Sequence, residues 1–311
     1  MQEATVLREA ARGPRRSARS AGLHLLFLGP FILLTVTFFV APAIITAVLG
    51  LTDLDEAFQG SFVGLQNFRG FLVDPLLPRV LLNTLVYVVF TLGFNVGMGL
   101  LLALLTTHLP DRAGTAFRAI WLLPRLTPVV VYGLLWLWFI DPTPYGLFNA
   151  VRIRLGMPPL DLISWSPWLV IVLVNGLIGA SLGMVIFTSA MRSIPEDYIR
   201  AARVDGASSL AVVRHIILPL IRWPLTFVLV AQTLALLTSY EYILVVTGGG
   251  PFYDSTVYAL YVFRRAIQNG DYGYGAALAF VLVAVGALAA LVYWRVLRFG
   301  RMITEPKIEV D

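Results

Sequence analysis

The sequence predicts an all-α membrane protein with six transmembrane helices. Of the 311 residues, 58% are hydrophobic and only 13% are charged, which leaves more apolar surface than a water-soluble domain of this size can bury. Six apolar runs are each long enough, at about 20 residues, to cross a hydrocarbon core of ~30 Å. Lys and Arg are also distributed unevenly among the segments that connect these runs. Together these observations favour a multi-pass membrane protein.

The six predicted spans cover residues 23–49, 80–107, 115–140, 168–191, 219–246 and 273–298. All should be helices, because backbone in lipid must satisfy its own hydrogen bonds, and runs such as residues 278–292 lack the alternation of a barrel strand. The first run is too long for a removed signal peptide, and it has no small-residue cleavage site in the expected place. We therefore expect a transmembrane domain over residues 23–299, a basic cytoplasmic tail over 1–22 and a second cytoplasmic tail over 300–311.

The basic residues predict the orientation. Sixteen of the 23 Lys and Arg residues fall in or beside segments assigned to the cytoplasm, and six fall in segments assigned to the outside. The positive-inside rule then places both termini in the cytoplasm, in agreement with an even number of helices. The net charge of +5 is accounted for by this topology and by attraction to anionic lipid headgroups. We expect membrane lipid as a partner and no nucleic acid.

Several kinds of chemistry are excluded or disfavoured. The chain has no Cys, which excludes disulfides, thiolate metal sites and Cys nucleophiles. The three histidines, His24, His108 and His215, lie at the ends of different predicted spans, which disfavours a metal cluster or a Ser-His-Asp arrangement. No Walker-type glycine loop is present to hold ATP. We therefore predict no catalytic residue, no metal and no cofactor bound by this chain.

One long cytoplasmic segment, residues 192–219, has an unusual composition. Ser193 and Glu196 have the spacing of a capping box, so a helix should start there. Glu196 is placed to pair with Arg200 four residues later, and the helix should stop near Asp205 and Gly206. The following list gives the residues expected to let another surface approach closely or to anchor it: Ala201, Ala202, Ala207, Ile199 and Val204. A plain solvated amphipathic loop is the alternative.

Residues 200–207, Arg-Ala-Ala-Arg-Val-Asp-Gly-Ala, followed by Ile-Ile-Leu-Pro at 216–219, resemble the EAA loop of binding-protein-dependent importer permeases. The resemblance implies a coupling helix that seats in a cleft on a separate cytoplasmic ATPase. The implied coupling residues are Glu196, Arg200, Ala201, Ala202, Asp205, Gly206, Ala207 and Pro219. Arg200 stands where the family usually has Glu, and Glu196, one turn earlier, is an alternative source of negative charge.

Other stretches resemble the carbohydrate-type permeases related to the maltose importer. They are residues 62–68, Asn83-Thr84 and the Thr-Gly-Gly-Gly-Pro run at 247–251, and the resemblance spans roughly residues 24–299. Physically, the glycine run indicates a tight external turn that needs positive φ values. The resemblance implies the type I fold of an ATP-binding-cassette importer permease that translocates a sugar across the bacterial inner membrane by alternating access.

The same resemblance implies the partners. A second homologous permease should complete the pathway, and two copies of a cytoplasmic ATP-binding-cassette ATPase should carry the ATP and Mg. An extracytoplasmic solute-binding protein should deliver the sugar. A glycerol-phosphate or polyol permease would share this architecture. An ion-coupled secondary transporter and an intramembrane enzyme are disfavoured, because we find neither facing intramembrane charges with internal repeats nor a catalytic constellation.

Polar side chains inside the spans are the candidates for the solute pathway, because a sugar hydroxyl stripped of water needs a hydrogen-bonding partner. The candidates are Asn95, Arg125, Asn175, Gln232, Tyr240, Glu241 and Tyr242. Each has an alternative. Arg125 could extend back to the cytoplasmic headgroups, the three amides could join helices by hydrogen bonds, and Glu241 could lie in external water. Pro124 and Pro128 predict a kink beside Arg125.

Overall fold

The computed structural model describes the fold of residues 18–296, with side chains described over residues 26–295. Most of the predicted tails, 1–22 and 300–311, therefore lie outside the described residues. Within the described residues the fold is helical, and the one β feature there is an isolated antiparallel bridge between Thr52 and Phe62. The all-α prediction is confirmed.

Four predicted spans are single crossings within a few residues of their expected ends. The first joins α2 (Ala18–Thr35), a π turn η1 (Val36–Val40) and α3 (Ala41–Leu49). The others are α5 (Leu77–Thr107), α10 (Pro167–Arg192) and α17 (Tyr272–Val296).

The third predicted span is broken rather than kinked. Helix α6 (Asp111–Leu126) and helix α7 (Val129–Phe139) meet at 100°. Thr127 is extended, with ψ 132°, because a residue before proline is forced out of the α region, and here that proline is Pro128. The kink predicted within residues 115–140 is therefore a complete break, which we call the α6–α7 elbow.

The fifth predicted span, residues 219–246, is also interrupted. The chain enters through α12 (Ser209–Val212), η2 (Val213–Ile217) and α13 (Leu218–Leu220), then bends by 73° into α14 (Arg222–Thr238). Ser239 is extended, with ψ 125°, and a separate helix α15 (Glu241–Val246) follows. The prediction of one helix to residue 246 is thus wrong. We call this second break the α14–α15 elbow.

The centre of the bundle is the close contact between α5 and α10. Glycines allow it: a Cβ on Gly99 would lie 2.9 Å from the Ala180 carbonyl oxygen, and one on Gly179 would lie 2.1 Å from Asn95 Nδ2. Helices in lipid have no hydrophobic driving force to associate, so they depend on close van der Waals packing, and small residues at the contact allow it.

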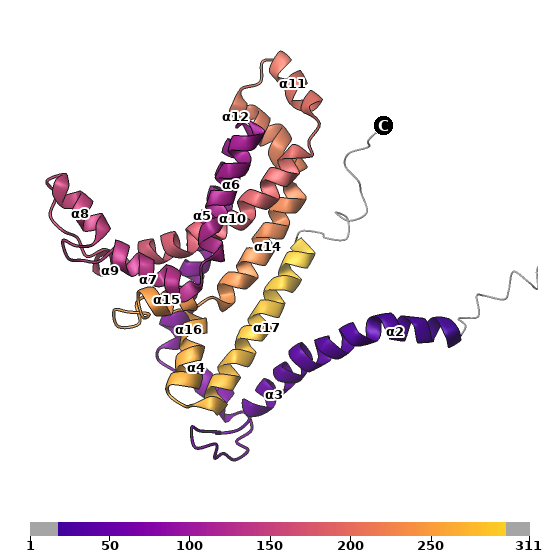
Figure 1. The fold of residues 1–311 in the computed structure, drawn as a ribbon. Helices are drawn as coiled ribbons and strands as arrows, with labels where there is room; N and C mark the ends of the chain where they lie inside the picture. Colours follow the sequence, from indigo (N-terminus) through magenta and orange to yellow (C-terminus); the bar gives the residue numbers. More distant parts are fainter. Residues whose placement is uncertain (1–17, 297–311) are drawn as a thin grey trace, which may run out of the picture.

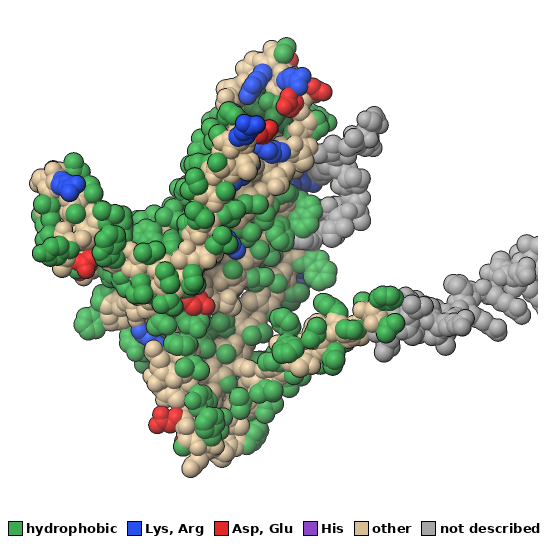
Figure 2. Space-filling view, viewed as in Figure 1, with side chains coloured by type: hydrophobic (Ala, Val, Ile, Leu, Met, Phe, Trp, Pro, Cys, Tyr) green, Lys and Arg blue, Asp and Glu red, His purple; other side chains and the backbone are tan. Residues whose placement is uncertain are grey.

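The first span diverges from the rest of the bundle as a long arm (Figure 1), and contacts the bundle where α3 packs against α17. Its apolar window is 0% buried within the chain. Figure 2 shows hydrophobic side chains over most of the visible face, with charged side chains gathered at the end formed by α11 and α12. An apolar arm without cover in this chain needs lipid or another protein around it.

Short helices occupy the two ends. At the end where α5 and α17 begin lie α4 (Gln66–Val73), α16 (Tyr258–Phe263) and η3 (Arg264–Gln268), while α8 (Leu147–Arg154) and α9 (Leu162–Trp165) form a side branch after α7. At the opposite end α11 (Glu196–Val204) projects beyond the spans (Figure 1).

Candidate functional site

Helix α11 occupies the segment matched to a coupling helix, but it does not start with a capping box. Ser193 is the C-cap of α10, and its hydroxyl donates to the Ala190 carbonyl at 2.8 Å. Helix α11 begins at Glu196 after Pro195, whose side chain cannot cap. The predicted reciprocal bonds of Ser193 and Glu196 are therefore wrong, because the preceding helix already uses the Ser hydroxyl.

The end of α11 is as predicted. Gly206 has φ +81°, its N–H donates to the Arg203 carbonyl at 3.1 Å, and the Ala207 N–H donates to the Ala202 carbonyl at 2.9 Å. These two bonds form a Schellman motif, in which glycine adopts the left-handed conformation without a Cβ clash. The motif stops the helix after about two and a half turns.

The two faces of α11 differ. Ile199, Ala202 and Ala207 pack against a buried cluster that includes Phe187, Met191 and other residues of α5, α10 and α14. On the outer face, the Val204 residue is 87% exposed, and Leu210 just beyond the helix is 76% exposed. The small residues Ala202 and Ala207 thus serve packing within this chain, while Ala201 and Val204 are open to another surface.

The charged residues of α11 form a local cluster. Arg200 Nη2 lies 2.6 Å from Glu196 Oε2, as predicted, and Arg200 Nη1 lies 3.7 Å from Asp197. All three side chains are exposed, so Glu196 is not an isolated negative charge but the partner of Arg200. Asp205 is exposed at the end of the helix, and Pro219 is exposed on α13.

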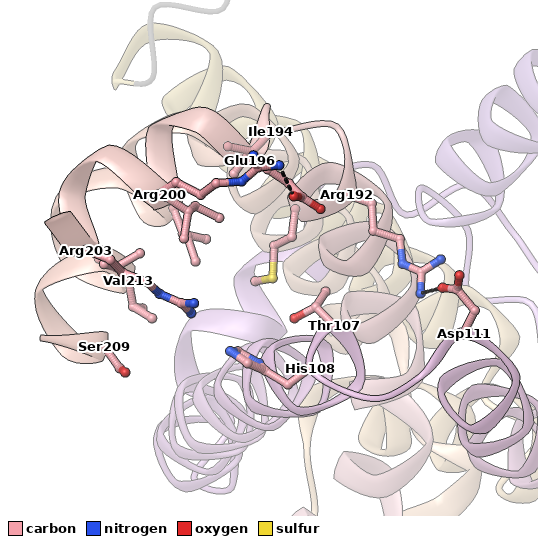
Figure 3. A pocket seen from close by; sticks show the side chains of 14 residues that line it. Thr107, His108, Asp111, Arg192, Ile194, Glu196, Arg200, Arg203, Ser209 and Val213 are labelled. Carbon is pink, nitrogen blue, oxygen red and sulfur yellow. Dashed lines mark hydrogen bonds and ion pairs between the residues drawn. The ribbon is translucent and has the colours of Figure 1, made fainter. Parts of the chain in front are cut away.

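A cavity of about 600 Å³ lies beneath α11. It is bounded by α11, the ends of α5 and α10, and the α12–η2 segment (Figure 3). Figure 3 shows Arg203 and His108 extending into it from α11 and from the end of α5. Two whole predicted spans, 115–140 and 168–191, separate these two residues in the sequence, so sequence reasoning missed the cavity.

The three predicted amides lie inside the bundle. The side chains of Asn95 and Gln232 hydrogen-bond at 2.9 Å, and Gln232 Nε2 donates to the Gly179 carbonyl at 2.8 Å. Asn175 Nδ2 donates to the Tyr87 hydroxyl at 3.0 Å, and that hydroxyl donates to Ser239 at 3.1 Å. These contacts join α5, α10 and α14, which matches the alternative of interhelical hydrogen bonds.

Arg125 lies in the last turn of α6, at the α6–α7 elbow, and is exposed. It comes 14 residues after Asp111, where α6 begins, or roughly 21 Å along the helix. Extension back to the headgroups and a role in the solute pathway both stay predictions for Arg125.

The two elbows lie against each other. Tyr242 of α15 packs edge to face on Tyr132 of α7 with ring centroids 6.1 Å apart, and Trp136 packs edge to face with Tyr132 at 6.3 Å. Arg125 and Glu241 are both near enough to Tyr242 to act on it electrostatically. Tyr240 instead turns toward α16, where it stacks on Phe263 at 5.0 Å. Aromatic rings therefore meet where two helices break, with Arg125 and Glu241 in the same region.

Asn83-Thr84, one of the short motifs that resemble carbohydrate permeases, is joined by hydrogen bonds to the loop that contains another, the glycine run. Asn83 Nδ2 donates to the Tyr253 and Thr256 carbonyls at 2.9 and 3.1 Å, and Thr84 accepts from the Tyr258 N–H at 2.7 Å. These bonds attach the glycine-run loop to α5. Gly248 and Gly249 have φ +57° and +75°, which confirms the predicted positive φ values at two of its three glycines.

A buried ionic cluster at the same end was not predicted. The Asp74 side chain is 6% exposed and accepts from the Tyr261 and Tyr274 hydroxyls at 2.5 and 2.9 Å, with Arg265 at 3.7 Å. Burial opposes the charge of Asp74, but these hydrogen bonds, one from the Leu76 N–H and the charge of Arg265 hold its pKa below the ordinary value. Nothing in the local sequence relates residues nearly 200 positions apart.

Comparisons with known proteins agree with this architecture. A protein-family model described as binding-protein-dependent transport system inner membrane component matches residues 95–299. The chain is similar to the sulfoquinovosyl glycerol transport system permease protein of Agrobacterium fabrum, with 29% identity over 89% of this chain and 90% of that protein. It is also similar to the trehalose/maltose transport system permease protein of Thermococcus litoralis, with 28% identity over 91% and 96%.

Among solved structures, the fold is similar to that of a bacterial alginate ABC transporter crystallised with an alginate pentasaccharide-bound periplasmic protein. The TM-score is 0.78, and the match covers 94% of this chain and 100% of that chain. Because the sequence identity is 22%, this likeness supports the fold alone.

Proposed function

The chain belongs to the family of binding-protein-dependent transport system inner membrane components, and on that premise we propose that it is the permease subunit of an ATP-driven sugar importer. The observation that carries the proposal is α11, a short helix that projects beyond the spans and exposes Val204 on its outer face. An exposed apolar residue at the tip of a membrane protein suits a docking surface.

In this proposal α11 seats on a cytoplasmic ATPase that holds the ATP and Mg. The outer face, with Ala201 and Val204, provides the contact, and Glu196, Arg200 and Asp205 provide charge around it. The inner face transmits movement, because Ile199 and Ala202 pack on the buried cluster shared by α5, α10 and α14. Since packed interfaces resist continuous deformation, a shift of α11 moves the spans as rigid bodies.

A second homologous permease and two ATPase copies complete the assembly. The support is the apolar arm formed by α2 and α3, whose window is 0% buried within this chain. A second permease and lipid are the surfaces that can cover it. We place α11 and both termini in the cytoplasm, and the solute-binding protein at the opposite end, where α4 and α16 lie.

The solute is a sugar. The two relatives are named for sulfoquinovosyl glycerol and for trehalose/maltose, and both are matched over most of their length. Within this chain, the paired elbows offer donors on Arg125, acceptors on Glu241 and the rings of Tyr242 and Trp136, which are the groups that bind sugar hydroxyls and faces. A glycerol-phosphate solute would call for a compact basic site, whereas this region holds the acidic Glu241 as well as Arg125.

The mechanism that follows is alternating access. The loaded binding protein docks at the outer end while ATP binding draws the two coupling helices together, so that the elbows open outward and receive the sugar. Hydrolysis separates the helices again and the pathway faces the cytoplasm. Broken helices suit this role, because interrupted backbone in a membrane lines a cavity and offers free polar groups there.

The test is reconstitution in proteoliposomes of the full assembly: this chain, the second permease, the ATPase and the binding protein, each from the same genome. We expect ATP hydrolysis to rise when the sugar-loaded binding protein is added, with sugar accumulating inside vesicles. An assembly that moves sugar along an ion gradient without ATP would contradict the proposal.

A further inference from the structure

The cavity beneath α11 has the chemistry of a binding site of its own. It lies where α5 and α10, two of the helices long and apolar enough to cross a membrane, end, and it has an apolar floor. The floor residues Met191, Ile194, Val212 and Ile217 are each less than a tenth exposed. An apolar floor of this kind favours a ligand that is partly hydrocarbon.

The rim carries an excess positive charge. Arg192 is paired with Asp111 at 2.9 Å and Arg200 with Glu196 at 2.6 Å, so the charges of these four residues sum to zero. Arg203 also lines the cavity, and among the residues that the structure describes it has neither an ion-pair partner nor a hydrogen-bond partner for its side chain. One uncompensated guanidinium therefore faces the cavity (Figure 3).

Two further polar side chains converge on the same space. His108 Nδ1 lies 2.6 Å from the Leu104 carbonyl oxygen, so Nδ1 carries the proton that bonds to this carbonyl. Nε2 is then an acceptor in the neutral ring, and it donates to a ligand when the ring carries its second proton. The hydroxyl of Ser209 lines the opposite wall. A guanidinium fork, a doubly protonated imidazole and a hydroxyl around one space are a set of donors that binds phosphate oxygens.

We propose that this cavity binds the phosphate headgroup of an anionic membrane lipid, with the first part of the lipid's hydrocarbon on the apolar floor. Basic pockets between helices at a membrane surface are suited to such headgroups. Free phosphate shares the headgroup chemistry, but it would leave the floor uncovered. A bound headgroup would join Arg203 on α11 to His108 on α5, so the lipid would hold α11 in position.

The test of this site is independent of the proposed sugar transport, because it needs only this chain. The full chain is purified in detergent, and binding of phosphatidylglycerol is measured by native mass spectrometry, with phosphatidylcholine as the uncharged comparison. The variants are R203Q and H108Q. The matched control is R214Q, because Arg214, on η2, is also an exposed arginine but does not line the cavity.

At raised ionic strength, where generic surface attraction is screened, R203Q should weaken phosphatidylglycerol binding at least about tenfold and R214Q should leave it unchanged. Inorganic phosphate should compete. If phosphate binds with the same dependence on Arg203 but phosphatidylglycerol does not, the site is for free phosphate, and the lipid assignment is overturned. Equal effects of R203Q and R214Q, or equal binding of both lipids, would overturn the site itself.

Discussion

The contact of Gly179 with Asn95 allows a sharp test of how α5 and α10 are held together. A Cβ at residue 179 would lie 2.1 Å from Asn95 Nδ2, whereas ordinary contact begins at 3.4 Å, so the Gly179→Ala variant requires a shift of 3.4 − 2.1 = 1.3 Å. Asn95 is 0% exposed and bonded to Gln232, so it cannot turn aside freely. Overpacking of this kind, with loss of the hydrogen bond between the Asn95 and Gln232 side chains, should lower the free energy of unfolding by about 2–3 kcal/mol.

The matched control is Gly97→Ala on the same helix as Asn95, because a Cβ there meets nothing within 4 Å. Both substitutions gain about 1 kcal/mol of helix propensity, so this gain cancels in the comparison. We expect G179A to melt roughly 5 °C below G97A when the full chain is heated in detergent.

A double variant tests the cause. Asn95→Ala removes the amide that the new methyl group would strike, so N95A/G179A should be no less stable than N95A alone. If instead the effects of N95A and G179A simply add, or if G97A is destabilised as strongly as G179A, the clash with Asn95 is not the reason and the account of this helix contact fails.

The remaining predictions concern both ends and the solute pathway. Asp74→Asn should lower the free energy of unfolding at neutral pH by about 1–3 kcal/mol. A carboxylate with a lowered pKa contributes stability above its ordinary pKa of 3.8 and loses it as the pH falls through the lowered value, so the variant and the native chain should become equally stable in acid. A stability difference that persists in a melting series at low pH would contradict this. Arg200→Ala should leave the melting temperature unchanged, since its ion pairs are exposed, while reducing ATP hydrolysis stimulated by the binding protein; unchanged stimulation would argue against a coupling role. Gly206→Ala should destabilise by about 1–2 kcal/mol through its φ of +81° alone, because a Cβ there meets nothing within 4 Å; a variant as stable as the native chain in the same melting assay would contradict the Schellman assignment. Glu241→Gln should reduce sugar uptake about tenfold without changing the melting temperature, and unaltered uptake would remove Glu241 from the pathway.

The sequence predicted the spans well because length and hydropathy decide them, and residues 80–107 and 168–191 each match a helix of the structure. The two elbows were harder to predict from the sequence than the spans. Pro128 marked the first break without giving its 100° angle, and no proline marks the break at Ser239 and Tyr240, which therefore depends on tertiary contacts. Hydropathy continues through such a break, so composition alone cannot detect it.

In the candidate site, too, features formed by neighbouring residues could be predicted, whereas features formed by residues far apart in the sequence could not. The helix stop at Gly206 and the pairing of Glu196 with Arg200 are local, and both were predicted correctly. The capping box failed because the Ser193 hydroxyl bonds to the previous helix. The cavity beneath α11 and the cluster around Asp74 join distant segments, and their members are recognisable only when the fold brings them together.

The measurement that tests the central claim most directly uses the natural absence of Cys. A single cysteine replaces Val204, which is 87% exposed on the outer face of α11, and the full assembly is treated with a thiol crosslinker with and without ATP. The control replaces Phe252, which is 89% exposed on the glycine-run loop at the opposite end. We expect V204C to crosslink to the ATPase in an ATP-sensitive way and F252C not to do so. If V204C gives no ATPase crosslink, or if F252C gives the same one, α11 is not the coupling helix and the importer mechanism is wrong.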